Sequence, residues 1–207
     1  MAPTCLLWAG RSAGALLCER CGNDLPRLAH ARCDVCALPI SEGSRCGACL
    51  SHLPAYDHVC APFTYVFSRD ALVQALKHRG LLAMAPLLGS TMANSLDEQP
   101  DIIIPMPLAK ARLAKCGFNP AQEIARHVSK ISGLPQMPHA CRKLRGTAPQ
   151  AALPWKEWAN NMGNAFVRDA TLNELAHNLK QTGATRVTEL LAARTQLGNF
   201  KKSAADV

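Results

Sequence analysis

The sequence predicts an α/β protein in which a small cysteine-rich module precedes a doubly wound domain. Eight of the ten cysteines stand within the first sixty residues, which sets this part of the chain apart. After them, short β-branched runs alternate with stretches of helical periodicity, as in a domain built on a parallel sheet. The 207 residues are 48% apolar, which suffices for one ordinary core and a small module. We expect residues 1–58 to form the module, residues 59–200 the α/β domain and residues 201–207 a disordered tail.

No stretch of the chain is apolar enough to predict a membrane span. A spanning helix needs about 18 or more consecutive apolar residues, and the longest apolar region, residues 81–89, is too short. The N-terminal segment faintly resembles a secretory signal, but it lacks a charged start and carries Arg11 within its apolar stretch. We therefore expect a mature cytoplasmic protein.

The expected elements of the second domain alternate between strands and helices. The pattern predicts strands at residues 62–67, 101–105 and 186–193, and helices at residues 69–79, 81–96, 120–132 and 172–181, with a basic loop at residues 109–118. The isoleucine-rich run at 101–105 is typical of a buried parallel strand. Asn119 and Thr171 suit helix N-caps, and Gly183 suits a helix end. The inward-facing stripes are predicted to be Leu72, Val73 and Leu76; Ile124, Ala125 and Val128; and Leu172, Leu175 and Leu179.

Three cysteine pairs in the N-terminal module have the spacing C-x-x-C. They are Cys18 with Cys21, Cys33 with Cys36, and Cys46 with Cys49. This spacing lets two thiolates from one tight turn reach a single tetrahedral zinc ion. A disulfide framework needs an oxidising compartment that nothing else in the sequence indicates, and a redox C-x-x-C is usually single. The pattern therefore predicts structural zinc.

Zinc ribbons use such pairs in twos, so the cysteines divide into two sets. One complete set consists of Cys33, Cys36, Cys46 and Cys49. In the other set Cys5 joins Cys18 and Cys21, and Trp8 stands where a fourth cysteine would fit. Three thiolates can hold zinc more weakly, with water or a histidine in the fourth place. His30 is either that ligand or an ordinary surface side chain. The other cysteines, Cys60, Cys116 and Cys141, are isolated and predicted to be plain thiols.

The net charge of +8 is concentrated in one segment of the chain. Residues 109–145 contain eight lysines and arginines and a single acid, Glu123, and so contribute +7. Such a segment suits a phosphate-rich partner, either a nucleotide-like ligand or nucleic acid. A solvated basic face is the alternative, and charge position alone does not decide between them. The cations are Lys110, Arg112, Lys115, Arg126, Lys130, Arg142, Lys143 and Arg145.

Short motifs follow the cysteine pairs in a fixed order. They are Ala75-Leu-Lys77, Ile104-Pro-Met-Pro-Leu108, Gly117-Phe-Asn119, Thr147-x-x-Gln150 and Asn160-x-x-Gly-Asn-Ala-Phe166. Their order and spacing resemble the bacterial ComF family, in which a zinc ribbon is joined to a type I phosphoribosyltransferase domain of Rossmann-like fold. Members of that family are associated with natural competence and DNA uptake. The resemblance extends over nearly the whole chain, from Cys5 to about residue 195.

The resemblance implies a substrate site and a type of chemistry. The chemistry that the resemblance implies for an active member is transfer involving phosphoribosyl pyrophosphate and Mg²⁺, which this chain would bind only if the site survives. The matching prolines lie near a pyrophosphate-contacting loop, and the Gly-Phe-Asn stretch corresponds to a flexible hood over the ligand. Read without the family, the prolines suit a strand end, the lysine a solvent-facing helix position and the asparagine a helix cap. The residues matched in this way are Lys77, Pro105, Pro107, Gly117, Phe118, Asn119 and Gln150.

The phosphate-binding signature of the family is missing from the chain. Family members carry two acidic residues at a strand end, followed by Thr-Thr-Gly-x-Thr at a helix N-terminus that holds the ribose phosphate. Here residues 163–170 run directly into Thr171, so that strand and most of its loop are absent. Cys116 and Trp158 also stand where arginines are common in the family. We therefore predict an impaired enzyme and assign no catalytic residue. The alternative is a binding module for single-stranded DNA or a competence protein, without catalysis.

Overall fold

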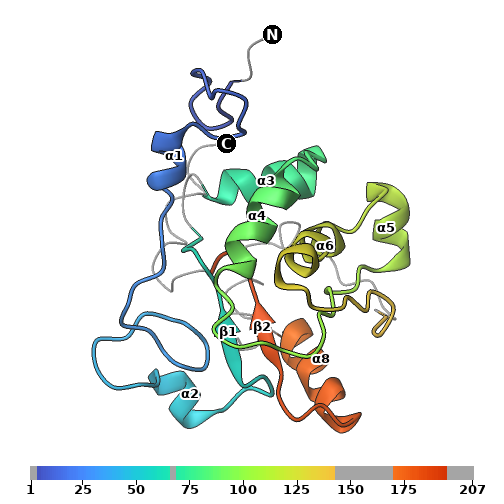
Figure 1. Cartoon of the computed structure of the whole chain (residues 1–207). Coiled ribbons are helices and arrows are strands. Elements are labelled where there is room, and N and C mark those ends of the chain that lie inside the picture. The colour runs from blue at the N-terminus through green and yellow to red at the C-terminus, as the bar shows by residue number, and fades with distance from the viewer. Residues whose placement is uncertain (1–3, 66–68, 143–169, 195–207) are drawn as a thin grey trace, which may run out of the picture.

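The computed structural model describes residues 4–65, 69–142 and 170–194, which form a mixed structure of helices and strands. The helices are α1 Glu19–Asn23, α2 Gly47–Ser51, α3 Arg69–Arg79, α4 Met84–Ala93, α5 Lys110–Cys116, α6 Pro120–Ser132 and α8 Ala170–Gln181. The strands are β1 His58–Cys60 and β2 Thr188–Leu190. Figure 1 shows the two strands side by side, with α3, α4 and α6 grouped together and α8 near β2. No helix within the described ranges is long and apolar enough to cross a membrane.

The two strands join segments from opposite ends of the chain in one parallel pair. Their register runs from His58 opposite Thr188 to Cys60 opposite Leu190. Beyond them the pairing continues only through isolated bridges, such as that between Thr64 and Arg194. Of the strand predicted at residues 62–67, the described part forms only isolated bridges, at Phe63 and Thr64, and residues 66–67 lie outside the described residues. Pro62 has no N–H to donate, so the ladder is interrupted there. The strand predicted at 186–193 is present but shorter.

The isoleucine-rich segment at residues 101–105 departs from its prediction as a buried strand. Ile103 forms one parallel bridge with Gln136, and the neighbouring Ile102 is 41% exposed. Among the described residues the sheet has two strands, so the apolar run has no wider sheet to enter. The α/β class is confirmed in this coarse form, whereas the doubly wound Rossmann-like sheet stays a prediction.

The helices predicted at residues 69–79 and 81–96 are present as α3 and α4, and α4 is shorter than predicted. Leu72, Val73 and Leu76 on α3 are buried, as the periodicity indicates. The chain turns at Gly80, whose φ is +64°. Helix α4 then begins at Met84 rather than at residue 81, which leaves Pro86 in the first turn, where its missing N–H costs little.

Helix α6 packs closely against α4 through a glycine. The Asn119 side chain caps α6 by accepting a hydrogen bond from the Ala121 N–H, as predicted. A Cβ atom added at Gly89 of α4 would lie only 2.5 Å from the Cβ of His127. Ala125 and Val128 are buried and Ile124 packs against the core, so the predicted inward stripe of α6 is confirmed.

Two further helices differ from their predictions. Residues 110–116 form α5, where a loop was expected, because alanine, leucine, lysine and arginine all favour helix. Gly117 ends α5 in the left-handed region with φ of 76°. Helix α8 begins at Ala170, so Thr171 lies within its first turn and is not its N-cap. Its predicted stripe is half-buried, and the fully buried residue is Ala176.

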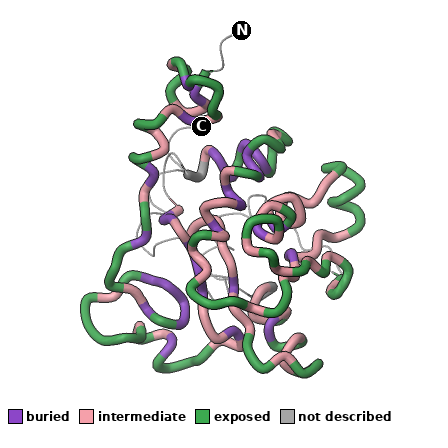
Figure 2. The backbone as a smooth tube through the Cα atoms, in the orientation of Figure 1, coloured by how far each residue is buried: buried purple, intermediate pink, exposed green. Residues whose placement is uncertain are grey.

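Many buried apolar residues fall into two clusters, and each cluster contains cysteines of the N-terminal segment. Figure 2 shows buried stretches both in this segment and in the elements that follow it. In the first cluster, Cys33 and Cys49 pack with Val59 of β1 and Ala176 of α8. In the second, Cys5 and Leu17 pack with residues of α3 and α4, including Leu72, Leu76, Met84 and Leu88. The N-terminal segment therefore shares its core with the elements that follow it. The division at residue 58 stays a prediction, and the tail at 201–207 lies outside the described residues.

Candidate metal centres and basic surface

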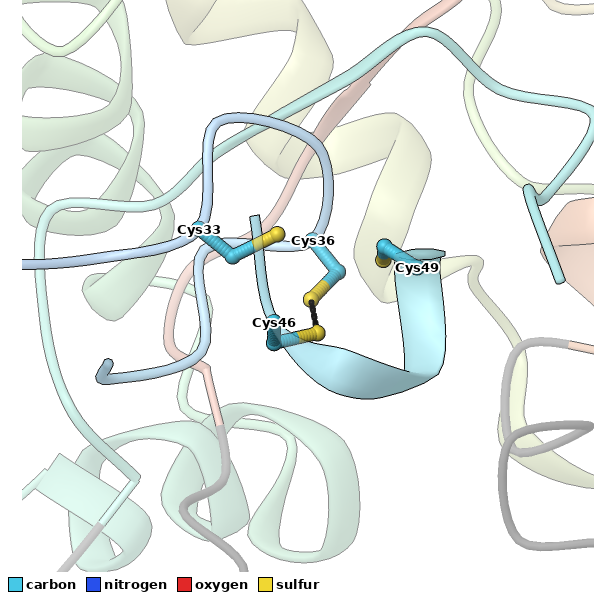
Figure 3. A group of neighbouring side chains, drawn as sticks. All are labelled: Cys33, Cys36, Cys46 and Cys49. Atoms are coloured by element: carbon cyan, nitrogen blue, oxygen red, sulfur yellow. Dashed lines mark hydrogen bonds between the residues drawn. The ribbon is translucent and has the colours of Figure 1, made fainter. Parts of the chain in front are cut away.

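Four cysteine side chains, two from a tight turn and two from the start of helix α2, lie close together (Figure 3). The sulfur atoms of Cys33, Cys36, Cys46 and Cys49 all lie within 4.8 Å of one another. Cys33 and Cys36 come from a tight turn, closed by a hydrogen bond from the Ala37 N–H to the Cys33 carbonyl. Cys46 is the N-cap of α2, and Cys49 lies within that helix. The structure therefore brings together the complete set that the spacing predicts.

The thiols of this group have opposed pKa shifts. Burial raises the pKa of Cys33, but N–H donors from Cys36, Cys46 and Val35 outweigh it and lower the value to about 7. Burial raises the pKa of Cys36 to about 11, and burial with neighbouring thiols also raises that of Cys49. Adjacent thiolates repel one another, and a divalent cation at their centre removes that repulsion. The donor set therefore fits tetrahedral zinc.

A second group consists of three cysteines near the start of the chain. The sulfur atoms of Cys5, Cys18 and Cys21 lie within 4.8 Å of one another. Burial raises the pKa of Cys5, but backbone N–H donors, with that of Cys18 foremost, lower it to about 6. A hydrogen bond with Cys18 is the main cause that raises the pKa of Cys21 to about 12. His30 is exposed and is not part of this group.

The two cysteine groups share one backbone design. Cys5, Cys18 and Cys21 correspond to Cys33, Cys46 and Cys49, each 28 positions later. Ala9 and Ala37, four residues after the first cysteine of each group, both have positive φ, at 57° and 56°. Three backbone hydrogen bonds of the first group recur in the second, 28 positions later. In the first group they run from Cys5 N–H to Gly10 O, from Leu6 N–H to Leu16 O and from Gly22 N–H to Cys18 O. In the second they run from Cys33 N–H to Leu38 O, from Asp34 N–H to Ser44 O and from Leu50 N–H to Cys46 O. The first group is therefore a structural repeat of the second.

Trp8 occupies the position in the first group that Cys36 has in the second. Its side chain is 70% exposed, so the indole does not fill the place of the missing thiol. A pocket of about 280 Å³ lies beside the group, lined by Trp8, Arg20, Cys21 and Asp24. The first group thus offers three thiols and an open side.

The basic segment presents its cations on α5. Lys110, Arg112 and Lys115 are all exposed on this helix, which carries no acidic residue. On α6, in contrast, Arg126 is paired with Glu123 at 3.1 Å. Lys77 on α3 is exposed but partly desolvated by neighbouring atoms, which lowers its pKa, and the positive charge of Arg112 lowers it further. The positive charges of Lys77 on α3 and Arg112 on α5 therefore act on one another.

The structure joins two of the motifs that resemble the family's substrate site. The Asn119 side chain donates a hydrogen bond from Nδ2 to the Met106 carbonyl at 3.0 Å, while its Oδ1 accepts the Ala121 N–H. Asn119 thus links the loop at residues 105–107 to α6, because its Nδ2 binds the loop and its Oδ1 binds the first turn of the helix. Pro105 is buried and Pro107 is half-buried in this loop.

The remaining residues of the implied site are less closely grouped. Phe118 is half-buried and packs against the second apolar cluster. Gly117, at the end of α5, has positive φ, and Lys77 is exposed near the end of α3. Gln150 lies outside the described residues, as do Trp158 and the junction where the phosphate-binding loop is missing from the sequence.

A third group of potential metal ligands was not predicted from the sequence. His58, Cys60 and Asp97 place a ring nitrogen, a sulfur and a carboxylate oxygen within 4.8 Å of one another. Cys60 is a buried free thiol, as predicted, but two other potential ligands lie beside it, so it is not isolated. The only sequence signal was the His-x-Cys spacing in a strand, which puts two side chains on one face. Cys116 is exposed, Cys141 is half-buried, and neither belongs to a ligand group among the described residues.

Comparison with known proteins gives one distant relationship. The chain is 24% identical over 168 residues to Competence protein F of Haemophilus influenzae, an alignment that spans 77% of this chain and 67% of that protein. No protein-family model matches the chain, and no solved structure matches it. The relationship confirms the resemblance to the ComF family that the ordered motifs predict.

Proposed function

We propose that this ComF-like protein serves natural competence by binding single-stranded DNA through the basic surface of α5, without phosphoribosyl transfer. The observation that carries the proposal is the set of exposed cations on α5, with no acid on that helix and with Lys77 of α3 close to Arg112. The distant relative of this chain is named for competence, which is the uptake of DNA.

Zinc has a structural part in this proposal. The four-thiol group would hold one ion through Cys33, Cys36, Cys46 and Cys49, and the three-thiol group a second ion more weakly. Each group is built into an apolar cluster that also contains later elements of the fold. Zinc bound there would stabilise the packing on which β1, α3 and α4 depend.

The proposed absence of phosphoribosyl transfer rests on the chain's own residues. The chain lacks the Thr-Thr-Gly-x-Thr loop and the acidic pair before it, which hold the ribose phosphate and the ribose hydroxyls in the family that the chain resembles. We therefore derive no catalytic step through Mg²⁺.

The DNA-binding proposal is tested by the salt dependence of affinity. Each contact with a single-strand phosphate contributes about 0.7 to the slope of log K against log salt concentration. Replacing Lys110, Arg112 and Lys115 with glutamine should therefore lower the slope by about 2 and weaken binding. The control replaces three exposed arginines of the cysteine-rich segment, Arg11, Arg20 and Arg45. Equal losses in the two triple variants would refute the assignment to α5.

The absence of phosphoribosyl transfer is tested by thermal unfolding with phosphoribosyl pyrophosphate and Mg²⁺. A ligand that binds the folded state at a hundredfold excess over its Kd adds about 2.7 kcal/mol of stability. We expect a cooperative transition at an unchanged Tm. An upward shift that depends on Mg²⁺ would show a retained substrate site and contradict this part of the proposal.

A further inference from the structure

Strand β1 places His58 and Cys60 on the same face, because side chains two residues apart in a strand point the same way. The intervening Val59 points to the opposite face and packs in the first apolar cluster. Asp97 reaches the shared face from the segment that follows α4. The side chain of His58 is 21% exposed and that of Asp97 is 59% exposed. An imidazole, a thiol and a carboxylate thus meet between the sheet and the solvent.

The hydrogen bond of His58 fixes which ring nitrogen is available. Its Nδ1 lies within hydrogen-bond distance of the Asp34 carbonyl oxygen. Because a carbonyl only accepts, Nδ1 must carry the hydrogen and donate it. The Nε2 lone pair of a neutral ring then faces Asp97. Metal-binding histidines are commonly oriented in this way, with the other ring N–H bonded to a backbone carbonyl.

The distances between the three side chains suit ligands of one metal ion better than direct hydrogen bonds. His58 Nε2 lies 3.6 Å from a carboxylate oxygen of Asp97, which is longer than a normal N–H···O bond. Two ligands on one tetrahedral zinc lie roughly 3.3–3.8 Å apart when their bonds to the metal are about 2.0–2.3 Å long. The Cys60 sulfur completes the group within 4.8 Å.

The charges around the group also allow a divalent cation. A thiolate and a carboxylate carry two negative charges, which one divalent ion neutralises. The backbone N–H of Asp97 donates toward the Cys60 sulfur, while burial, followed by the Asp97 carboxylate, raises the pKa of this thiol. The carboxylate of Glu98 next to Asp97 is already paired with Arg186 at 2.8 Å. Arg32 is the nearby positive charge that opposes a cation.

We propose that His58, Cys60 and Asp97 form a third metal site, which binds one zinc ion and leaves the fourth position open to water. The mixed nitrogen, sulfur and oxygen donors suit zinc, and three protein ligands with an open position are the arrangement of reactive rather than purely structural zinc sites. This site is separate from the two cysteine groups and does not depend on the proposed DNA binding.

The test is the number of zinc ions that the full-length reduced protein binds. Wild type is expected to bind one zinc more per chain than His58→Ala or Cys60→Ala. Asp97→Asn should bind that ion at least tenfold more weakly, since even outer-shell changes cost about 10–100-fold. The matched controls are His139→Ala, at an exposed histidine outside the group, and Glu98→Gln, beside Asp97.

Both outcomes of the zinc titration are informative. The proposal is supported if both controls bind as wild type does while the three ligand variants lose the same ion. If the buried Cys60 variant or His58→Ala fails to fold by circular dichroism, Asp97→Asn decides, because its side chain is largely exposed. Equal zinc numbers and affinities in wild type and folded Asp97→Asn would overturn the proposal. The group would then be a simple pair of His58 with Asp97.

Discussion

Replacing Trp8 with cysteine should convert the three-thiol group into a complete zinc site. The backbone of residues 5–24 repeats that of the four-thiol group, and residue 8 stands where Cys36 stands in that group. A thiol at this position would point toward Cys5, Cys18 and Cys21. The substitution Trp8→Cys therefore adds the one ligand that the repeat lacks.

The expected gain can be worked from the number of ligands. Structural zinc contributes about 10–16 kcal/mol to small four-ligand domains, or about 2.5–4 kcal/mol for each ligand. Because 1.4 kcal/mol is a factor of ten, the fourth thiol should tighten zinc binding roughly 100-fold. Trp8 is 70% exposed, so its removal uncovers about 75 Å² and costs at most about 2 kcal/mol.

The comparison that isolates the ligand is Trp8→Cys against Trp8→Ser. Both variants lose the indole, but only one gains a thiolate. Zinc would be measured by competition with a chelator under reducing conditions, with the ion held by Cys33, Cys36, Cys46 and Cys49 as an internal reference. If Trp8→Cys released its zinc as readily as Trp8→Ser, the inferred equivalence of residues 8 and 36 would be wrong.

Substitutions at three further positions test the packing and the polar contacts. Gly89→Ala should cost about 1–3 kcal/mol by overpacking, seen as a lower urea midpoint, because its Cβ would lie 2.5 Å from that of His127. Asp57 accepts hydrogen bonds from Lys180 and the Val187 N–H, both at 2.7 Å; burial opposes its ionisation, but these donors lower its pKa. The ionised Asp57 side chain therefore stabilises the fold above the unfolded pKa, and this effect is lost as the pH falls through the folded pKa. Asp57→Ala should lower the free energy of unfolding by about 1 kcal/mol at neutral pH and leave it unchanged in strong acid. Denaturant titration at both pH values measures the difference. Asn119→Ala should lower thermal stability by about 1 kcal/mol, whereas Asn119→Asp, which keeps the cap oxygen, should lose less.

The parts of the structure that the sequence predicted are those fixed by local chemistry. The C-x-x-C turns follow from ligand spacing, and α6 from its Asn119 cap, so both were located correctly. The segment at 101–105 was misassigned because an apolar run indicates burial only if neighbouring strands exist to pair with it. Helix α5 was predicted as a loop although its alanine, leucine, lysine and arginine residues all have high helix propensity.

The third ligand group could not be predicted from the sequence. His58 and Cys60 are neighbours in a strand, but Asp97 stands far along the chain, and nothing in its local pattern links it to β1. The same holds for Lys77 and Arg112, which the fold brings together from separate helices. Local spacing predicts ligands within one turn, whereas sites assembled from distant segments require the packing to be known.

The pairing of β1 with β2 sets an order in which the protein can form during synthesis. Asp57 and Val187, which are hydrogen-bonded at the start of the sheet, stand 130 residues apart in the sequence. A ribosome adding about 5–20 residues per second needs roughly 6–26 seconds to make that stretch. The cysteine turns can close on metal early in this interval, but β1 must wait with an open edge until β2 emerges. The nascent chain therefore carries an unpaired strand beside a cysteine group whose packing partner Ala176 of α8 is also still to be made, and it is at this stage that chaperones would protect it most.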